Sequence, residues 1–474
     1  MLELGGTAID ACVAMAAVSW VVMPDMCGPG GDLFALWREP EGRIVAINGA
    51  SYAPTVFGTP GTTQDRAALS LVPGAPAAIS ALITTGCRLG LRELFEPALA
   101  IAKSGSAVGE GLARELQALA PGPLRAALTD AHGGTMPKFG ERFNLPRFAE
   151  SLESWVDSNS PHPALFWAAE DWGLHGSTIT PEEACAVVIE RQEPLMLRLG
   201  DWTIYAQPPM SQSIATLLAL GIAGLEAMRQ PDTPLRDHIM IEAYKAAWRD
   251  ISKLGEGEDL AMSVRALLDP DRLSACRRSI GPRAFSDTAL VEKHGDTTQC
   301  AAADSEGRVC TLVHSLSSAF GSQILSPRTG WIANDRGQSF TNGLNAPAPG
   351  RRPRNSLVGM LASRADGLCV ALGTPGAQAQ TQTVLQVVAN LLRKSHDLWG
   401  AVVAPRWICA DGNRVAVEAG IAGDRMRMLE HAGHIITPAP ALDWRMGSVS
   451  LAAFDGHIAS AVADPRREAL ALAL

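Results

Sequence analysis

The sequence lacks any cysteine pattern that would support a disulfide framework. Its nine cysteines are an odd set, and no two of them stand in a Cys-x-x-Cys spacing. Small secreted domains that depend on disulfides carry evenly paired cysteines. We therefore expect reduced and mostly buried thiols, with Cys300 and Cys310 serving as small apolar side chains in a core.

The apolar run near the N-terminus is not expected to be a targeting segment. No lysine or arginine precedes Arg38, so the apolar run from Ala11 to Met23 lacks the positive flank of a signal peptide. At about 1.5 Å per residue the run spans only about 20 Å as a helix, which is too short for a bilayer core. The run predicts a buried helix, and we expect a cytoplasmic protein with no membrane partner.

A surplus of basic residues is absent as well. The formal net charge is -9 and the sequence pI is near 5.6, which gives no reason to expect nucleic acid as a partner. Hydrophobic residues make up 47% of the chain and charged residues 19%, and these fractions exclude a disordered or collagen-like chain. A chain of 474 residues can form one large α/β core.

Metal and phosphate motifs are not recognisable either. His431 and His434 stand three residues apart, but no third ligand follows at a usual spacing. His238 stands four residues before Glu242, and this pair also lacks a third ligand at a usual spacing. The glycine-rich segment 27–31 lacks the Lys-Ser/Thr of a phosphate loop and predicts a tight turn. We expect neither a metal ion nor a cofactor.

Strand and helix patterns alternate along the whole chain, without a fixed-period repeat or a flexible linker between domains. Helices are predicted at 8–22, 75–84, 91–103, 213–225, 237–248 and 380–392. Strands are predicted at 33–37, 44–47, 202–206, 369–372 and 448–454. The Pro-, Arg- and Asn-rich stretch 342–355 predicts a loop, which either covers a site as a lid or lies solvated on the surface.

A β-hairpin is predicted from Thr297 onward. If Asp304 faces Arg308 across a three-residue loop, the register places Thr297 directly opposite Ser315. A bulge at Gly307 would shift this register by one residue. The hairpin therefore sets a hydroxyl group across from the threonine at the head of the first strand.

That threonine can carry chemistry on its own. A threonine pair such as Thr297-Thr298 is common at strand starts because threonine favours strands, so the pair alone indicates little. If the bond between Asp296 and Thr297 breaks, however, the freed amine of Thr297 can act as general base to its own hydroxyl. Ser315 would then lie close enough to orient that amine.

A second chemical element is predicted where the strand 369–372 turns into the helix 380–392. The turn contains Gly373, Pro375, Gly376 and Ala377. Backbone N–H groups at a helix start have no intrahelical partner and can bind the oxyanion formed when a carbonyl is attacked. An ordinary strand-to-helix turn would have a similar sequence, and that alternative stays open on the residues alone.

Further short segments complete the pattern. In chain order they include Gly5-Gly6-Thr7-Ala8-Ile9-Asp10-Ala11, Cys27-Gly28-Pro29-Gly30-Gly31-Asp32, Val72-Pro73-Gly74, Pro208-Pro209-Met210-Ser211, Phe320-Gly321-Ser322, Ala404-Pro405-Arg406 and Asp464-Pro465-Arg466. In order and spacing, the chain from about residue 5 to 465 resembles the γ-glutamyltranspeptidase family of N-terminal nucleophile hydrolases.

The resemblance implies an α/β fold, the four-layer αββα sandwich, formed jointly by two subunits cut from one precursor. Cleavage between Asp296 and Thr297 would give a large subunit 1–296 and a small subunit 297–474 that begins with the nucleophile. Gly376 and Ala377 match the paired oxyanion glycines of the family, and Ala377 still supplies a backbone N–H. The implied partners are a small-molecule acyl substrate and the other subunit, and a homodimer is compatible with the family.

The acyl pocket departs from that of the family's transpeptidases. Ala50 stands in place of the arginine that holds the glutamyl α-carboxylate, and Arg336 and Ser339 replace residues that hold the α-amine. The usual serine pair reads Asn355-Ser356, and Ser317 is a further candidate substrate contact. A cation at Arg336 would repel an amine and attract a carboxylate. The alternatives are that Arg336 faces solvent or ties down the 342–355 loop.

These departures favour a self-processing amidohydrolase or acylase, similar to cephalosporin acylases or oxamate amidohydrolase, that acts on an acidic acyl group other than γ-glutamyl. One alternative is a relative that cleaves a carbon–carbon bond in an antibiotic pathway to alkylproline units. A genuine γ-glutamyl hydrolase or transferase and a non-catalytic scaffold remain as further alternatives. Thr297 and Ser315 argue against the scaffold, and Ala50 argues against the transferase.

Overall fold

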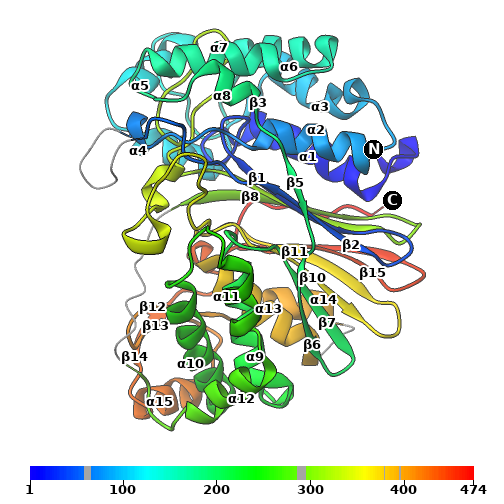
Figure 1. The fold of residues 1–474 in the computed structure, drawn as a ribbon, viewed down its shortest axis with the longest axis vertical. Coiled ribbons are helices and arrows are strands. Elements are labelled where there is room, and N and C mark those ends of the chain that lie inside the picture. Colours follow the sequence, from blue (N-terminus) through cyan, green and yellow to red (C-terminus); the bar gives the residue numbers. More distant parts are fainter. Residues whose placement is uncertain (58–65, 286–294, 378, 394–396, 474) are drawn as a thin grey trace.

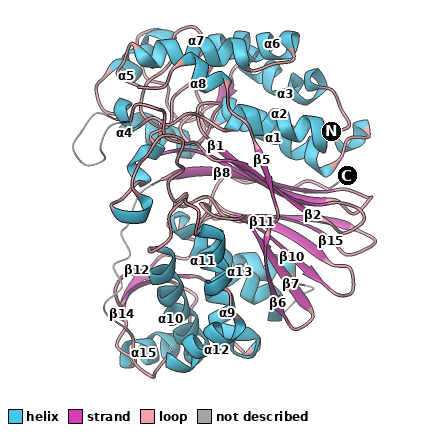
Figure 2. Cartoon of the chain, in the orientation of Figure 1, coloured by secondary structure: helices cyan, strands magenta, loops and turns pink. Residues whose placement is uncertain are grey.

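The computed structural model describes residues 1–57, 66–285, 295–377, 379–393 and 397–473. Two antiparallel sheets are stacked face to face, and helices cover the outer face of each sheet (Figure 1, Figure 2). This arrangement confirms the predicted four-layer αββα sandwich. Among the described residues, no helix is both long and apolar enough to cross a lipid bilayer.

The first sheet has five strands. Its order is β5 (Glu190–Gln192), β2 (Ile44–Gly49), β1 (Asp32–Arg38), β9 (Val309–Ser317) and β8 (Asp296–Ala303). Helices α1 (Ala8–Val22) and α2 (Ala75–Thr85) pack on its outer face. The other N-terminal helices lie on the same side of the sheet (Figure 1). They are α3 (Leu91–Ser104), α4 (Glu110–Ala118), α5 (Pro123–Ala131), α6 (Pro146–Ser158), α7 (His162–Gly173) and α8 (Pro181–Cys185).

The second sheet has six strands. Its order is β16 (Ala459–Ala463), β15 (Ser450–Phe454), β11 (Cys369–Gly373), β10 (Gly359–Arg364), β7 (Trp202–Ala206) and β6 (Leu195–Leu199). The helices of the opposite outer layer are α9 (Ser213–Arg229), α10 (Pro234–Ile251), α11 (Leu260–Leu267), α12 (Pro270–Ser279), α13 (Ala379–Arg393), α14 (Leu398–Val403) and α15 (Gly423–His431).

Smaller elements complete the described chain. A three-stranded sheet contains β12 (Trp407–Asp411), β13 (Arg414–Glu418) and β14 (Ile435–Ala439), and a two-stranded sheet pairs β3 (Ser106–Ala107) with β4 (Arg142–Phe143). Short 3-10 helices are η1 (Leu2–Leu4), η2 (Ala67–Leu69), η3 (Arg336–Ser339), η4 (Gly343–Asn345) and η5 (Trp444–Met446).

Helix α1 shows why the apolar N-terminal run is a core element. The side chain of Thr7 accepts hydrogen bonds from the backbone at the helix start, and Asp10 bonds back to the Thr7 N–H, which closes a capping box. Most of the helix is buried, and it contacts α3 on one side and β8 and β9 on the other. Burial on both sides explains why the run is apolar all round.

The cysteines behave as predicted from their pattern. All nine lie in the described part of the chain and carry free thiols. Cys300 and Cys310 are buried in the core between the first sheet and its helices. Burial raises the pKa of the Cys300 thiol to about 12, so this group stays protonated at neutral pH. Their role as packing residues is confirmed.

The predicted hairpin is present as β8 and β9, with one difference in register. The Asp304 N–H donates to the Arg308 carbonyl at 3.0 Å, as the three-residue loop requires. The bulge lies at the Thr297 end of the ladder and not at Gly307. Thr297 therefore lies opposite both Ser315 and Leu316, so the prediction of a direct pair with Ser315 is only partly correct.

Candidate active site

Thr297 lies at the start of β8 and points into the space between the two sheets. Side chains alternate between the two faces of a strand, so Thr297 and Gln299 lie on the same face. The side chain of Gln299 accepts a hydrogen bond from the backbone N–H of Ser450, in the second sheet, at 3.2 Å. The intervening Thr298 instead places its hydroxyl 3.8 Å from the sulfur of Met23, on the α1 side. Thr297 is 2% exposed in the intact chain.

Gln380, in the first turn of α13, contacts the hydroxyl of Thr297. Its Nε2 donates to Thr297 Oγ1 at 3.1 Å, and its Oε1 accepts from the backbone N–H of Val358 at 3.1 Å. The second bond fixes which end of the amide faces the threonine. Sequence reasoning missed this residue, although its position just after the Gly376 turn was a usable signal, since a helix that starts at a site brings its first turn there.

The Gly376–Ala377 turn lies beside the segment that would be cleaved. A Cβ atom added to Gly295 would lie 3.4 Å from the Cβ of Ala377. Gly376 and Ala377 have φ angles of 124° and 50°, so the chain takes left-handed conformations here before α13 begins. Among the described residues, neither of their N–H groups has a hydrogen-bond acceptor. This geometry leaves two donors at a helix N-terminus, and their role in binding an oxyanion stays a prediction.

Ser315 lies in β9 between Asp32 on β1 and Thr297 on β8. Asp32 is the cross-strand partner of Ser315, so these two side chains share the face that looks toward the second sheet. The Ser315 hydroxyl oxygen accepts a hydrogen bond from the Ser317 N–H at 2.8 Å. It accepts another from Nη2 of Arg336 at 3.3 Å.

Arg336 is buried and has an acidic partner that the sequence did not reveal. The Nε of Arg336 donates to Oδ2 of Asp32 at 2.7 Å, and Arg336 is only 3% exposed. The alternative that Arg336 faces solvent is therefore wrong. Because Asp32 neutralises the guanidinium, Arg336 offers less charge to an acidic substrate than the sequence alone suggested.

The other predicted substrate contacts lie at the end of β9, in η3 and in the segment before β10. Ser317 has a φ of 87° and its hydroxyl accepts from Gln338 Nε2 at 3.2 Å. Asn355 is buried, and its side-chain oxygen accepts from the Leu357 N–H at 3.1 Å. Ser339 and Ser356 are partly buried. Contact of these residues with substrate stays a prediction.

The surroundings of Ala50 are apolar. Ala50 is buried in a small cluster with Phe34, Val313 and Leu357, between the two sheets. The methyl side chain of Ala50 cannot hold the α-carboxylate of a glutamyl group as an arginine would. This arrangement agrees with the departure from the transpeptidases seen in the sequence.

His314, the neighbour of Ser315, faces the other side of the sheet. Its Nδ1 accepts a hydrogen bond from the indole N–H of Trp20 in α1 at 3.0 Å. Burial lowers the pKa of His314 to about 3, so the ring is neutral at any pH at which the protein would be assayed. His314 is therefore a core residue and not an acid or base of the site.

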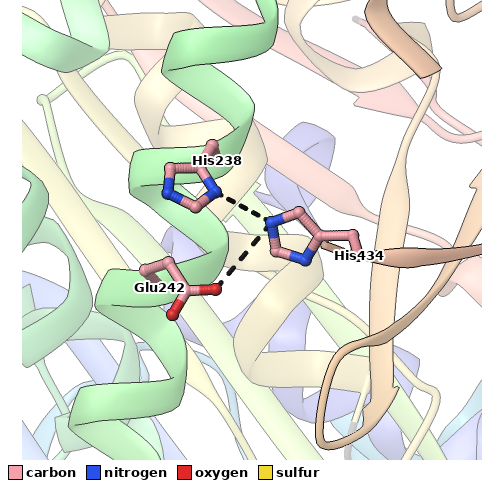
Figure 3. Close-up of side chains that lie close together, drawn as sticks. All are labelled: His238, Glu242 and His434. Carbon is pink, nitrogen blue, oxygen red and sulfur yellow. Dashed lines mark hydrogen bonds and ion pairs between the residues drawn. The ribbon is translucent and has the colours of Figure 1, made fainter. Parts of the chain in front are cut away.

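A second cluster of titratable residues joins the two histidine pairs that the sequence kept apart. His238 and Glu242 on α10 meet His434 from the turn before β14 (Figure 3). Nδ1 of His238 is 2.9 Å from Nε2 of His434, and that nitrogen is 3.8 Å from Oε1 of Glu242. The three ligand-type atoms all lie within 4.8 Å of one another.

The charges around this cluster favour a structural role over metal binding. The Lys245 ammonium lies 2.5 Å from Glu242 Oε1, so a divalent cation there would sit beside a buried positive charge. Lys245 also donates to the Phe285 carbonyl at 2.7 Å, and Glu242 accepts from the Phe285 N–H at 3.1 Å. Burial, Lys245 and His238 lower the pKa of His434 to about 3. The cluster ties residues 281–285 to α10.

The αββα sandwich with these elements is the fold of the N-terminal nucleophile hydrolases. Residues 1–474 match the family model of gamma-glutamyltranspeptidase. The chain therefore belongs to the γ-glutamyltranspeptidase family.

Relatives within the family include enzymes that are named as acylases and amidohydrolases. The oxamate amidohydrolase proenzyme of Klebsiella pneumoniae subsp. pneumoniae is 28% identical, over 86% of this chain and 82% of that protein. The acylase ACY 1 proenzyme of Pseudomonas sp. strain V22 is 28% identical, over 95% of this chain and 87% of that protein. The crystal structure of cephalosporin acylase from Bacillus halodurans matches with a TM-score of 0.90 and 26% identity, over 98% of this chain and 91% of that one.

Proposed function

We propose that this protein is a self-processing amidohydrolase or acylase whose nucleophile is Thr297 and whose acyl substrate is not γ-glutamyl. The observation that carries the proposal is the placement of Thr297 at a strand start between the sheets. Its hydroxyl is held by Gln380, and the preceding Gly295 lies beside Ala377, whose N–H, like that of Gly376, has no acceptor within the described part of the chain. Self-cleavage would divide the precursor into subunits 1–296 and 297–474.

Processing starts with attack of Thr297 Oγ1 on the carbonyl carbon of Asp296. The C–N bond breaks as an ester bond forms, so the acyl group moves from nitrogen to oxygen and the Thr297 amine is released. Water then hydrolyses the ester, which returns the hydroxyl to Thr297 and leaves a carboxylate on Asp296.

Turnover repeats the attack on a substrate amide. The Thr297 amine takes the hydroxyl proton, and the N–H groups of Gly376 and Ala377 stabilise the oxyanion. Collapse of the tetrahedral intermediate transfers the proton to the leaving amine and gives an acyl-threonine. Water clears the acyl group in a second addition and elimination, with the Thr297 amine again as base. Ser315 positions that amine.

The apolar surroundings of Ala50 and the presence of Ser339 support an acyl group other than γ-glutamyl. The similarity to an oxamate amidohydrolase and to an acylase supports testing oxalyl and glutaryl amides first. Carbon–carbon cleavage next to a carbonyl would use the same nucleophile, and product analysis by mass spectrometry separates it from amide hydrolysis. A small acyl-donor panel therefore addresses both alternatives.

The first experiment follows cleavage by denaturing mass spectrometry. Wild-type protein is expected to yield fragments that begin at Met1 and Thr297, and Thr297→Ala is expected to remain uncut. Thr298→Ala is a matched control, because this neighbour faces α1 and should leave cleavage intact. A wild-type chain that stays whole after prolonged incubation would exclude the proposed activity.

The second experiment uses the processed enzyme with the donor panel. We expect hydrolysis of an oxalyl or glutaryl amide to exceed that of γ-glutamyl-p-nitroanilide. Efficient γ-glutamyl transfer would overturn the proposed specificity while leaving the nucleophile in place.

A further inference from the structure

We propose that the buried pair Arg336 and Asp32 positions Ser315 and sets the protonation of the Thr297 amine, so that the amine is neutral and able to act as a base. This inference rests on the proposed function, since the amine exists only after cleavage before Thr297. It assigns Arg336 a role different from that of a substrate clamp.

The geometry places the pair directly behind Ser315. Asp32 and Thr297 flank Ser315 on the two neighbouring strands, β1 and β8. Arg336 reaches over this row, with Nε on Asp32 at 2.7 Å and Nη2 on the Ser315 hydroxyl at 3.3 Å. The guanidinium therefore bonds directly to Ser315, which lies across from Thr297.

Both members of the pair are held in place by backbone groups. Oδ1 of Asp32 accepts from the Ser51 N–H at 2.7 Å, which leaves Oδ2 for the guanidinium. The Arg336 N–H donates to Oδ1 of Asn334 at 3.0 Å, and Asn334 in turn donates to the carbonyls of Gly30 and Leu71. With Asp32 at 0% and Arg336 at 3% exposure, solvent screens the pair weakly.

Arg336 and Asp32 act on the Thr297 amine with opposite signs. Ser317 N–H and Arg336 Nη2 both donate to the Ser315 oxygen, and these two bonds hold the Ser315 hydroxyl beside β8. A nearby cation disfavours the ammonium form of an amine, so Arg336 favours the neutral form. The Asp32 carboxylate acts in the opposite sense.

Other charged or titratable groups lie around this end of β8. On neighbouring elements they are Asp25 and Cys27 after α1, His314 on β9, Asp335 before η3, and Arg406 and Asp464 behind the Gly376 turn. Asp335 pairs with Arg66 at 2.9 Å and Arg406 with Asp464 at 2.5 Å. These groups are unchanged in every variant below, so their effect on the pKa of the Thr297 amine is the same in each protein compared.

The test is the acid limb of the pH profile of kcat/KM, measured on processed enzyme. This limb reports the pKa of the base in the free enzyme, because activity falls as the amine gains a proton. Arg336→Gln leaves the Asp32 carboxylate unopposed, so the limb should move to higher pH by about 1 unit. Asp32→Asn leaves the guanidinium unopposed, so the limb should move to lower pH by a similar amount.

The double variant Asp32→Asn with Arg336→Gln removes both charges, and its limb should return to within a few tenths of a pH unit of the wild type. A purely structural role for the pair would lower activity at every pH without moving the limb. Unmoved limbs in the processed single variants, or shifts of the same sign in both, would overturn the inference.

A measurement on the wild type covers the case in which a single variant fails to fold. Protein labelled with ¹⁵N-threonine allows direct NMR titration of the Thr297 amine after cleavage. Its titration midpoint is expected below the ordinary range for a terminal amine, about 7.7 to 8.0. A midpoint within or above that range would overturn the inference. Absence of cleavage before Thr297 would instead contradict the proposed function itself, so the two failures are distinguishable.

Discussion

At the scale of single residues, the candidate site depends on contacts between side chains that are far apart in the sequence. Gln380 and Thr297 are 83 positions apart, and Arg336 and Asp32 are 304 positions apart. No spacing rule connects such pairs, so the sequence could indicate Thr297 and the Gly376 turn but not the residues that hold them. The fold supplies that information by bringing α13, β1 and η3 to one end of β8.

Gln380 gives the first prediction. Gln380→Met removes the amide that donates to Thr297 Oγ1, and one lost hydrogen bond of this kind should slow cleavage by about tenfold. Gln382→Met is a closely matched control, since Gln382 lies on the same helix and bonds Cys409 with both ends of its amide. A time course on denaturing gels measures both rates. Equal slowing in the two variants would show a general packing effect.

Ser315 gives a second prediction at this scale. Ser315→Ala should lower turnover by roughly tenfold in processed enzyme, because the Thr297 amine loses a positioning partner and Arg336 loses an acceptor. Ser322→Ala removes a comparable buried hydroxyl, whose partner is the Ala333 carbonyl, and should leave turnover nearly unchanged. Steady-state rates at one pH suffice. Full turnover in Ser315→Ala would remove Ser315 from the mechanism.

At the scale of elements, prediction succeeded where the hydrophobic pattern was strong. Helix α1 and strand β7 have the predicted bounds, since α1 is a nearly unbroken apolar run and β7 strictly alternates buried and partly buried residues. The helices α4 to α8 and the strands β12 to β14 were not predicted. The strands and the helix α8 have five residues each, too few for a clear period. The helices α6 and α7, with 13 and 12 residues, were missed despite their length. The bulge in β9 opposite Thr297 was also missed, because register irregularities depend on the neighbouring strands.

The contact between α1 and β9 gives a prediction about stability and pH. Burial lowers the pKa of His314 to about 3 in the folded state, against about 6.5 when unfolded. The unfolded chain therefore binds more protons between these values, so the free energy of unfolding is highest above about pH 6.5 and falls as the pH drops below it. The slope from this one residue approaches about 1.4 kcal/mol per pH unit.

His314→Gln tests this contribution. Glutamine can still accept the Trp20 indole hydrogen bond but has no proton to bind. The free energy of unfolding is measured by urea titration at pH 7 and pH 5.5 in a Thr297→Ala background, which keeps the chain whole. Between pH 7 and pH 5.5 it should fall by about 1 kcal/mol more in the protein with His314 than in the protein with glutamine. An equal loss in both proteins would mean that His314 titrates normally in the fold.

At the scale of the whole molecule, the proposed cut between Asp296 and Thr297 does not divide the fold into two bodies. The first sheet would combine β5, β2 and β1 of the large subunit with β9 and β8 of the small one. The second sheet would combine β7 and β6 of the large subunit with β10, β11, β15 and β16 of the small one. Hydrogen-bonded ladders β1–β9 and β7–β10 join the two parts in both sheets.

This interleaving predicts that cleavage changes the chain but not the assembly. Denaturing mass spectrometry should show fragments of about 31 and 19 kDa from the 50.0 kDa chain, by the proportion of residues. Native mass spectrometry should still show both fragments together in each protomer, because separation would expose two sheet edges and both cores. The uncut Thr297→Ala chain is the reference for the native mass. Separation of the fragments without denaturant would contradict a sandwich built jointly by the two subunits.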